Sequence, residues 1–127
     1  MSQFNSTGSK AFSTGVAGLT RYQRVKLVAG VLQIAGADET AIGFVWGFVG
    51  ASADVAIGDV VTVRLLTSAG TSKAIASGAV VEGAVLYGDA DGKVTSTDGG
   101  SYTARFIALD AGSADGSVIE VLPTTLS

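Results

Sequence analysis

The chain has 127 residues and a mass of 12.6 kDa, enough for one domain with a hydrophobic core and little more. Hydrophobic residues make up 47% of the chain and charged residues 15%, which excludes a disordered or fibrous protein. Because the chain contains no cysteine and no histidine, disulfides, thiol or imidazole catalysis, and zinc sites built on these residues are excluded. We therefore expect neither an enzyme nor a cofactor.

The charges are unevenly distributed along the chain. The first 37 residues carry four basic and no acidic side chains, whereas the remainder carries four basic and eleven acidic ones. A basic leader on an acidic body indicates that the two ends meet different surroundings, although a solvated basic face is the simpler explanation. Four basic residues are too few for a nucleic-acid footprint. Since the sequence shows neither an eighteen-residue apolar run nor a Sec signal pattern, we expect no membrane partner and synthesis in a cytoplasm.

Residues 1–20 are predicted to form a flexible N-terminal arm, and residues 21–127 a β domain. Met1 to Gly18 is rich in Ser, Thr and Gly, so it cannot bury enough surface to offset its own ordering entropy. Its two phenylalanines either become ordered against a partner or fold back onto the domain. The candidate partner-binding residues of this region are Phe4, Lys10, Phe12, Arg21 and Arg24.

The β domain opens with two short strand candidates and a strongly apolar one. Arg24 to Val28 and Val31 to Ile34 flank a turn at Ala29-Gly30, which predicts a hairpin. Ala41 to Val49 follows as the most apolar strand candidate in the chain.

That apolar strand has one bulky face and one nearly flat face. Phe44, Trp46 and Phe48 share a face at period two, and this stripe indicates either core packing or a subunit contact. The opposite face carries Gly43 and Gly47, which would let another backbone approach closely.

The next segments are a half-buried strand and an ambiguous stretch. Val60 to Leu66 alternates apolar and polar residues, as a half-buried antiparallel strand does. Thr67 to Ser77 is dominated by small residues, and this pattern fits either a surface loop or a thin edge strand.

The C-terminal part repeats the same order of strands and turns. Its four strand candidates, separated by glycine-rich turns, are Val85 to Tyr87, Lys93 to Thr97, Tyr102 to Leu109 and Val118 to Leu122. The order matches the four earlier candidates about 60 residues upstream, which indicates an internal duplication, although turn-punctuated β sequences can also look alike by composition alone. The predicted fold is all-β: a single small antiparallel barrel or sandwich of about eight to ten strands, with at most one or two helical turns.

No stretch carries the pattern of a catalytic or metal site. Asp89-Ala90-Asp91-Gly92 resembles the start of a calcium loop, but the glycine and glutamate required at its sixth and twelfth positions are missing. Lys73 has serines nearby, yet small-residue loops produce such neighbours by chance. Most carboxylates lie beside Gly or Ala, which is typical of turns.

The order and spacing of several short strings resemble the capsid decoration, or cement, proteins of tailed phages. The strings are Arg24-Val25-Lys26-Leu27, Ala41-Ile42-Gly43, Ser77-Gly78-Ala79, Val85-Leu86-Tyr87, Asp91-Gly92-Lys93-Val94, Ile107-Ala108-Leu109-Asp110-Ala111 and Val118-Ile119-Glu120-Val121-Leu122. The resemblance implies a non-enzymatic all-β protein, made in the host bacterium, that binds the major capsid protein on the outer surface of an icosahedral head. It also implies a homotrimer that reinforces the shell. The chain departs from the family in its heavier aromatic run and longer arm.

A different class of function stays open. A carbohydrate- or host-surface-binding β module is the alternative, and aromatic residues exposed on a groove would favour it. The high apolar fraction also indicates that part of the surface is covered by further copies or by a shell.

Overall fold

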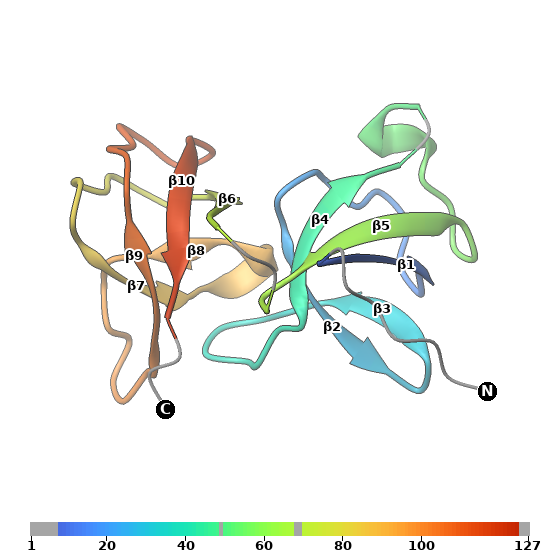
Figure 1. The fold of residues 1–127 in the computed structure, drawn as a ribbon, viewed down its shortest axis with the longest axis horizontal. Helices are drawn as coiled ribbons and strands as arrows, with labels where there is room; N and C mark the ends of the chain where they lie inside the picture. The colour runs from blue at the N-terminus through green and yellow to red at the C-terminus, as the bar shows by residue number, and fades with distance from the viewer. Residues whose placement is uncertain (1–7, 49, 68–69, 125–127) are drawn as a thin grey trace.

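The computed structural model describes residues 8–48, 50–67 and 70–124, and these form ten strands and two single-turn 3-10 helices, with no α-helix among them (Figure 1). The all-β prediction is confirmed. The elements in order are β1 (Ser9–Ser13), β2 (Arg24–Val28), β3 (Val31–Ile34), β4 (Gly43–Gly47), η1 (Ser52–Asp54), β5 (Val60–Leu65), β6 (Ser72–Ile75), β7 (Val85–Gly88), η2 (Ala90–Gly92), β8 (Val94–Thr95), β9 (Ala104–Ala108) and β10 (Val118–Pro123).

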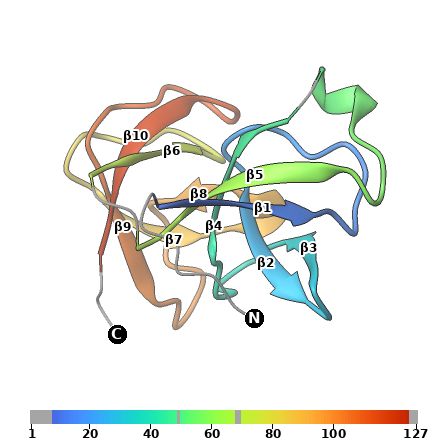
Figure 2. The same cartoon turned by 45° about the vertical axis from the view of Figure 1, so that its right-hand side comes forward.

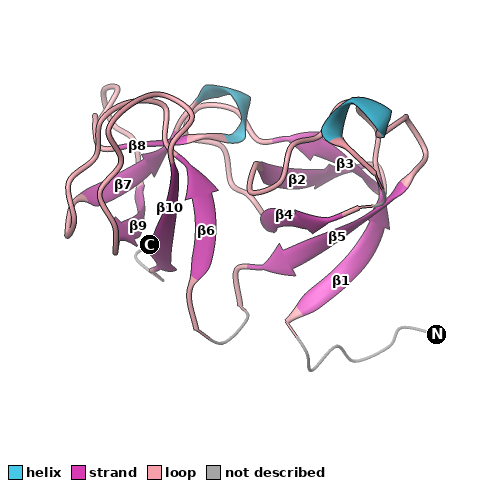
Figure 3. Ribbon diagram, turned by 90° about the horizontal axis from the view of Figure 1, so that it is seen from above, coloured by secondary structure: helices cyan, strands magenta, loops and turns pink. Residues whose placement is uncertain are grey.

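The strands form two five-stranded antiparallel sheets, ordered β1-β5-β4-β2-β3 and β6-β10-β9-β7-β8. The sheets make a sandwich, and neither closes into a barrel (Figures 1 and 2). Viewed from above, each sheet occupies its own side of the molecule (Figure 3). Of the two predicted architectures, the structure therefore has the sandwich.

The two sheets have the same topology, which confirms the internal duplication. β1 to β5 correspond one by one to β6 to β10, about 60 residues later, and the strand orders then coincide. The closing strands β5 and β10 start at Val60 and Val118, and each has six residues. We call the part from β1 to β5 the first repeat and the part from β6 to β10 the second repeat.

Backbone hydrogen bonds outside the strands repeat as well. Thr14 N donates to Asp59 O at 2.9 Å, and the equivalent Ala76 N donates to Ser117 O at 2.8 Å. The residue after each opening strand also forms an isolated parallel bridge to the third strand, Thr14 with Leu32 and Ala76 with Val94. Since unrelated β segments would not share such loop contacts, composition alone does not explain the likeness.

Each repeat has its own cluster of buried residues, and the two clusters are completed differently. In the first repeat, Phe12 of β1 faces Val61 and packs on the core. The equivalent position in the second repeat, opposite Ile119, is the smaller Ala74. The ring of Phe44, which belongs to the first repeat, joins this second cluster and lies 5.4 Å from the ring of Phe106. The first core is thus complete by itself, whereas the second includes a ring from the first repeat.

Candidate interaction surface

The predicted arm is in part a strand of the first sheet. Ser9–Ser13 pairs with β5 along its whole length, Phe12 packs on the first core, and Leu19 is fully buried. The boundary expected at residue 20 is therefore wrong, because the ladder to β5 compensates for the ordering entropy of a segment poor in apolar residues. Of the two alternatives for Phe12, folding back is correct. Lys10 remains exposed, and Phe4 lies outside the described residues.

Arg24 is fully buried, which corrects its assignment as a partner-binding residue. Its Nη2 donates to Gly36 O at 2.8 Å, and its Nη1 lies 3.4 Å from the carbonyl oxygens of Asp89 and Lys93. Burial, together with the nearby charge of Arg105, lowers the pKa of Arg24 to about 10. The guanidinium stays charged at neutral pH and holds loops of both repeats together, so it is not available to a partner.

Arg24 belongs to a row of side chains at the boundary between the repeats. Arg24, Phe44 and Arg64 are direct cross-strand neighbours on β2, β4 and β5. Arg24 contacts carbonyl groups of the second repeat, Phe44 packs on Phe106, and Arg64 Nε donates to Thr71 O at 3.1 Å. We call these three residues the seam row, because they lie along the boundary between the repeats.

The aromatic stripe of β4 does not stay on one face. Phe44 is fully buried, Trp46 is exposed, and Phe48 packs on the edge of the first core. The register between β4 and β5 shifts between Val45 and Gly47, so Trp46 lies in a bulge and the period-two alternation is interrupted. The prediction that Phe48 shares a face with Phe44 is therefore wrong. Phe44 is a core residue, as the core-packing alternative predicted.

The flat face of β4 does allow the expected close approach. A Cβ atom added at Gly43 would overlap the carbonyl oxygen of Arg64 on the neighbouring strand. Only glycine fits there without moving the strand.

Trp46 lies within a cluster of aromatic and cationic side chains that spans both repeats. The Arg64 guanidinium is 5.3 Å from the centre of the Trp46 ring, and Tyr22 makes an edge contact with Trp46 at 5.7 Å. Lys73 of the second repeat places its Nζ 5.8 Å from the Tyr22 ring. We call Tyr22, Trp46, Arg64 and Lys73 the basic-aromatic surface. Each cation–π contact at an exposed site contributes about 0.5–1 kcal/mol.

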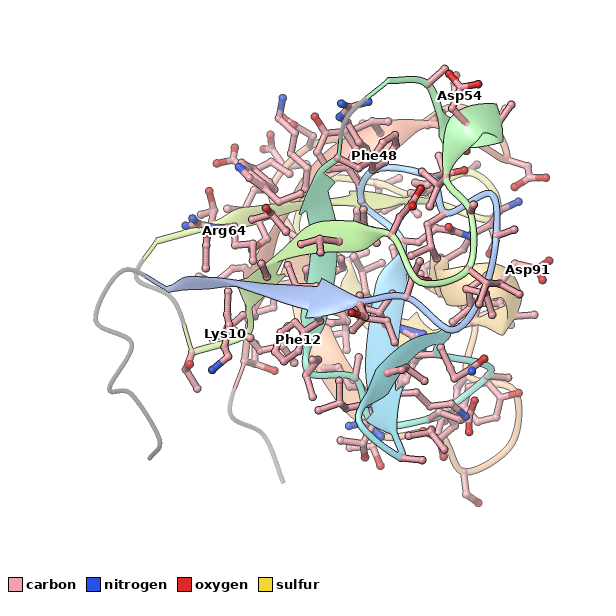
Figure 4. The ribbon with its side chains drawn as sticks, turned by 90° about the vertical axis from the view of Figure 1, so that its right-hand side faces the viewer. Lys10, Phe12, Phe48, Asp54, Arg64 and Asp91 are labelled. Atoms are coloured by element: carbon pink, nitrogen blue, oxygen red, sulfur yellow. The ribbon has the colours of Figure 1, made fainter. Side chains whose placement is uncertain are left out.

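A second surface feature is an open groove of about 500 Å³ at the end of β4, lined by Phe48, Gly50, Asp54, Val55, Asp59 and Val60. The exposed Arg21 covers part of Phe48: its guanidinium lies 4.3 Å from the ring centre, and its Nη2 donates to Phe48 O at 3.3 Å. Figure 4 shows Phe48 and Asp54 toward the top of the view, and Lys10 and Arg64 toward its left side. The predicted basic candidates are thus dispersed over several places.

The sequence missed three members of the basic-aromatic surface. Tyr22 has a φ of +75°, a left-handed conformation that nothing in its neighbourhood predicts for a tyrosine. Arg64 could be assigned to the polar face of its strand, but its position beside Trp46 depends on sheet register. Lys73 comes from the other repeat and meets Tyr22 only through the packing of the two sheets.

Two further classes of site find no support in the described residues. Within them, no three acidic side chains gather closely enough to hold a metal ion. Asp89 instead accepts hydrogen bonds from Ala90 N and from the Ser77 hydroxyl, as a turn residue does. No helix in this part of the chain is long and apolar enough to cross a membrane.

No protein-family model matches the chain, and no curated protein matches it in sequence. Among solved structures, the crystal structure of the head fiber gp8.5 N base of bacteriophage phi29 is similar, with a TM-score of 0.67 at 18% sequence identity. The match covers 91% of this chain and 92% of that one. The chain therefore shares its fold, over nearly its whole length, with the N base of a phage head fiber.

Proposed function

We propose that this chain is a non-enzymatic structural protein of a phage virion that binds the outer surface of the head and stabilises the shell. The observation that carries the proposal is the fold shared with the phi29 head fiber base across about nine-tenths of both chains. The sequence resemblance to capsid decoration proteins supports the same location. The partner would be the major capsid protein, and the expected assembly on the head is a homotrimer.

The basic-aromatic surface is the part of the chain that we propose contacts the shell. Tryptophan and arginine dominate binding energy at protein interfaces, and here an exposed Trp46 lies beside Arg64. Lys73 extends the positive charge, which would attract an acidic capsid surface. The exposed Lys10 and Arg21 remain candidates for peripheral charge contacts.

The test is binding of purified variants to heads that lack this protein, measured by co-sedimentation. Trp46→Ala should weaken binding at least tenfold, about 1.4 kcal/mol, because an aromatic anchor is lost. Lys73→Ala should weaken it less and reduce its salt dependence. Ile57→Ala, which shortens a strongly exposed side chain outside this surface, is the matched control.

Shell stabilisation needs a separate measurement. Heads with the protein added back should release their DNA at a higher temperature than bare heads, because a ligand that binds only the intact shell stabilises it by mass action. Unchanged binding by Trp46→Ala would refute the assigned surface, and an unchanged release temperature would refute stabilisation.

The groove beside Phe48 favours a second candidate function, binding of carbohydrate or of a host surface. Its aromatic ring and the carboxylates of Asp54 and Asp59 could accept a polyhydroxylated ligand. The two functions depend on different residues, so Phe48→Ala would abolish retention on a glycan array while leaving head binding intact. Loss of head binding in Trp46→Ala, without any effect on glycan retention, identifies the first function.

A further inference from the structure

The outer face of the second repeat carries an exposed apolar row. Val85, Ile107 and Leu122 are direct cross-strand neighbours on β7, β9 and β10. They alternate with the fully buried Leu86 and Phe106, so they point away from the second core. Val85 is 44% and Leu122 39% exposed. We call these three residues the outer row.

The outer row is the counterpart of the seam row of the first repeat. When the two repeats are aligned by their strand pairing, Val85, Ile107 and Leu122 take the positions of Arg24, Phe44 and Arg64. Arg24 and Phe44 of the seam row are covered because the second repeat packs on them. The same face of the fold is therefore a packing face in one repeat and an open surface in the other.

The seam row packs on a surface of the second repeat, and the corresponding surface of the first repeat is exposed. Arg24 lies against Gly88, where an added Cβ atom would be 2.5 Å from its Nη2. The position of Gly88, which pairs with Val94, corresponds in the first repeat to Leu27, which pairs with Leu32.

The tip of the β2–β3 hairpin therefore exposes apolar side chains at the receiving position. Leu27 is 42% and Val28 46% exposed. The side-chain sizes are complementary in both contacts. Inside the chain the long Arg24 meets Gly88, and between two copies the shorter Val85 would meet Leu27. The exposed side chains of both surfaces, Val85 and Leu122 on one and Leu27 and Val28 on the other, are apolar, so they suit each other better than they suit an acidic shell.

We propose that the outer row of one copy packs on the Leu27–Val28 tip of another copy, in a head-to-tail contact that repeats the packing of the first repeat on the second. Such a contact joins different surfaces, so it closes into a ring or extends as a chain. Because Phe12 completes the first core, each copy is folded before it associates. This contact does not depend on binding to heads.

Cysteine cross-linking tests the proposal directly, because the chain has no cysteine of its own. The double variant Leu27→Cys/Val85→Cys, treated with a short bismaleimide, should give covalent dimers and larger species. Either single variant should give no covalent dimers, since a head-to-tail contact never brings two equivalent residues together. Dimers from Val85→Cys alone, or no cross-linking of the double variant, would overturn the proposal.

Charge substitutions provide an independent measurement by sedimentation equilibrium. Val85→Asp and Leu27→Asp should each raise the dissociation constant of self-association at least tenfold, because each buries a carboxylate in an apolar contact. Ile57→Asp, at a strongly exposed position outside both surfaces, is the control and should have no effect. Circular dichroism confirms that each variant is folded.

Mixing the two charge variants distinguishes the head-to-tail arrangement from any other. The Val85→Asp copy keeps its intact Leu27–Val28 tip, and the Leu27→Asp copy keeps its intact outer row. An equimolar mixture should therefore form dimers and nothing larger, although neither variant associates alone. A mixture that stays monomeric, or a wild-type chain that stays monomeric at every concentration, would show that these surfaces do not pair.

Discussion

The buried Arg24 should be a major source of stability, and its replacement by alanine tests how the repeats are joined. The substitution removes a fully buried side chain and leaves the carbonyl groups of Gly36, Asp89 and Lys93 without their charged donor. A buried carbonyl left unsatisfied costs about 1–3 kcal/mol, and water entering the cavity recovers part of that cost. We expect the free energy of unfolding to fall by about 3–5 kcal/mol, a large share of the stability of a small domain.

A double-mutant cycle with Gly88 separates this contact from general core damage. In the wild-type chain, Gly88→Ala forces its new Cβ against the Arg24 guanidinium, so it should cost about 1–3 kcal/mol. In the Arg24→Ala background the guanidinium is absent, and the same substitution should be nearly neutral. The coupling free energy between Arg24 and Gly88 in this cycle should therefore be at least about 1 kcal/mol.

The assay is guanidinium chloride unfolding, followed by far-UV circular dichroism and by the fluorescence of Trp46, the only tryptophan. Lys26→Ala is the control on the same strand, because Lys26 makes only a partly exposed ion pair with Glu39 and should contribute less than about 1 kcal/mol. Equal costs of Gly88→Ala in both backgrounds would refute the role given to Arg24.

Phe44→Ala should lower the free energy of unfolding by about 3–5 kcal/mol, measured by calorimetry, because its buried ring packs on Phe106 in the second core. A chain starting at Leu19 should unfold at a clearly lower denaturant concentration, since it lacks β1 and the ring of Phe12, and an unchanged midpoint would show that β1 is dispensable. Hydrogen bonds from Lys26 and the Gly36 amide lower the pKa of Glu39. The ionised carboxylate therefore stabilises the folded chain at pH values above its ordinary pKa of 4.5, and this stabilisation is lost as the pH falls through the lowered pKa of the folded state. Urea midpoints between about pH 2 and pH 6 should therefore depend less on pH in Glu39→Gln.

The sequence predicted the strands whose side chains alternate clearly and whose ends are marked by glycine turns. β5 and β10 are the best examples, because buried and exposed residues alternate along both. β1 was missed because a segment of Ser, Lys, Ala and Phe has weak β propensity, and its pairing with β5 is a long-range contact. The duplication contained the missing information: a fifth strand opening the second repeat at Ser72–Ile75 implies one at Ser9–Ser13.

The interaction surface was less predictable than the fold, for three physical reasons. The bulge at Trp46 interrupts the alternation that assigned Phe48 to the face of Phe44. From the sequence, Arg24 was a candidate for partner binding, and only the packing of one repeat on the other reveals its carbonyl partners. Tyr22 and Lys73 lie far apart in sequence and meet across the two sheets.

The divergence of the two repeats explains why their packing has a direction. The second repeat has Ala74 and Gly88, small residues that make room for the ring of Phe44 and the guanidinium of Arg24. At the position of Ala74 the first repeat has Phe12, which fills its own core, and at the position of Gly88 it has the exposed Leu27. One repeat thus inserts side chains and the other receives them. An isologous contact would require each surface to pair with itself, whereas a duplicated unit with distinct inserting and receiving faces already contains the polarity that head-to-tail association requires.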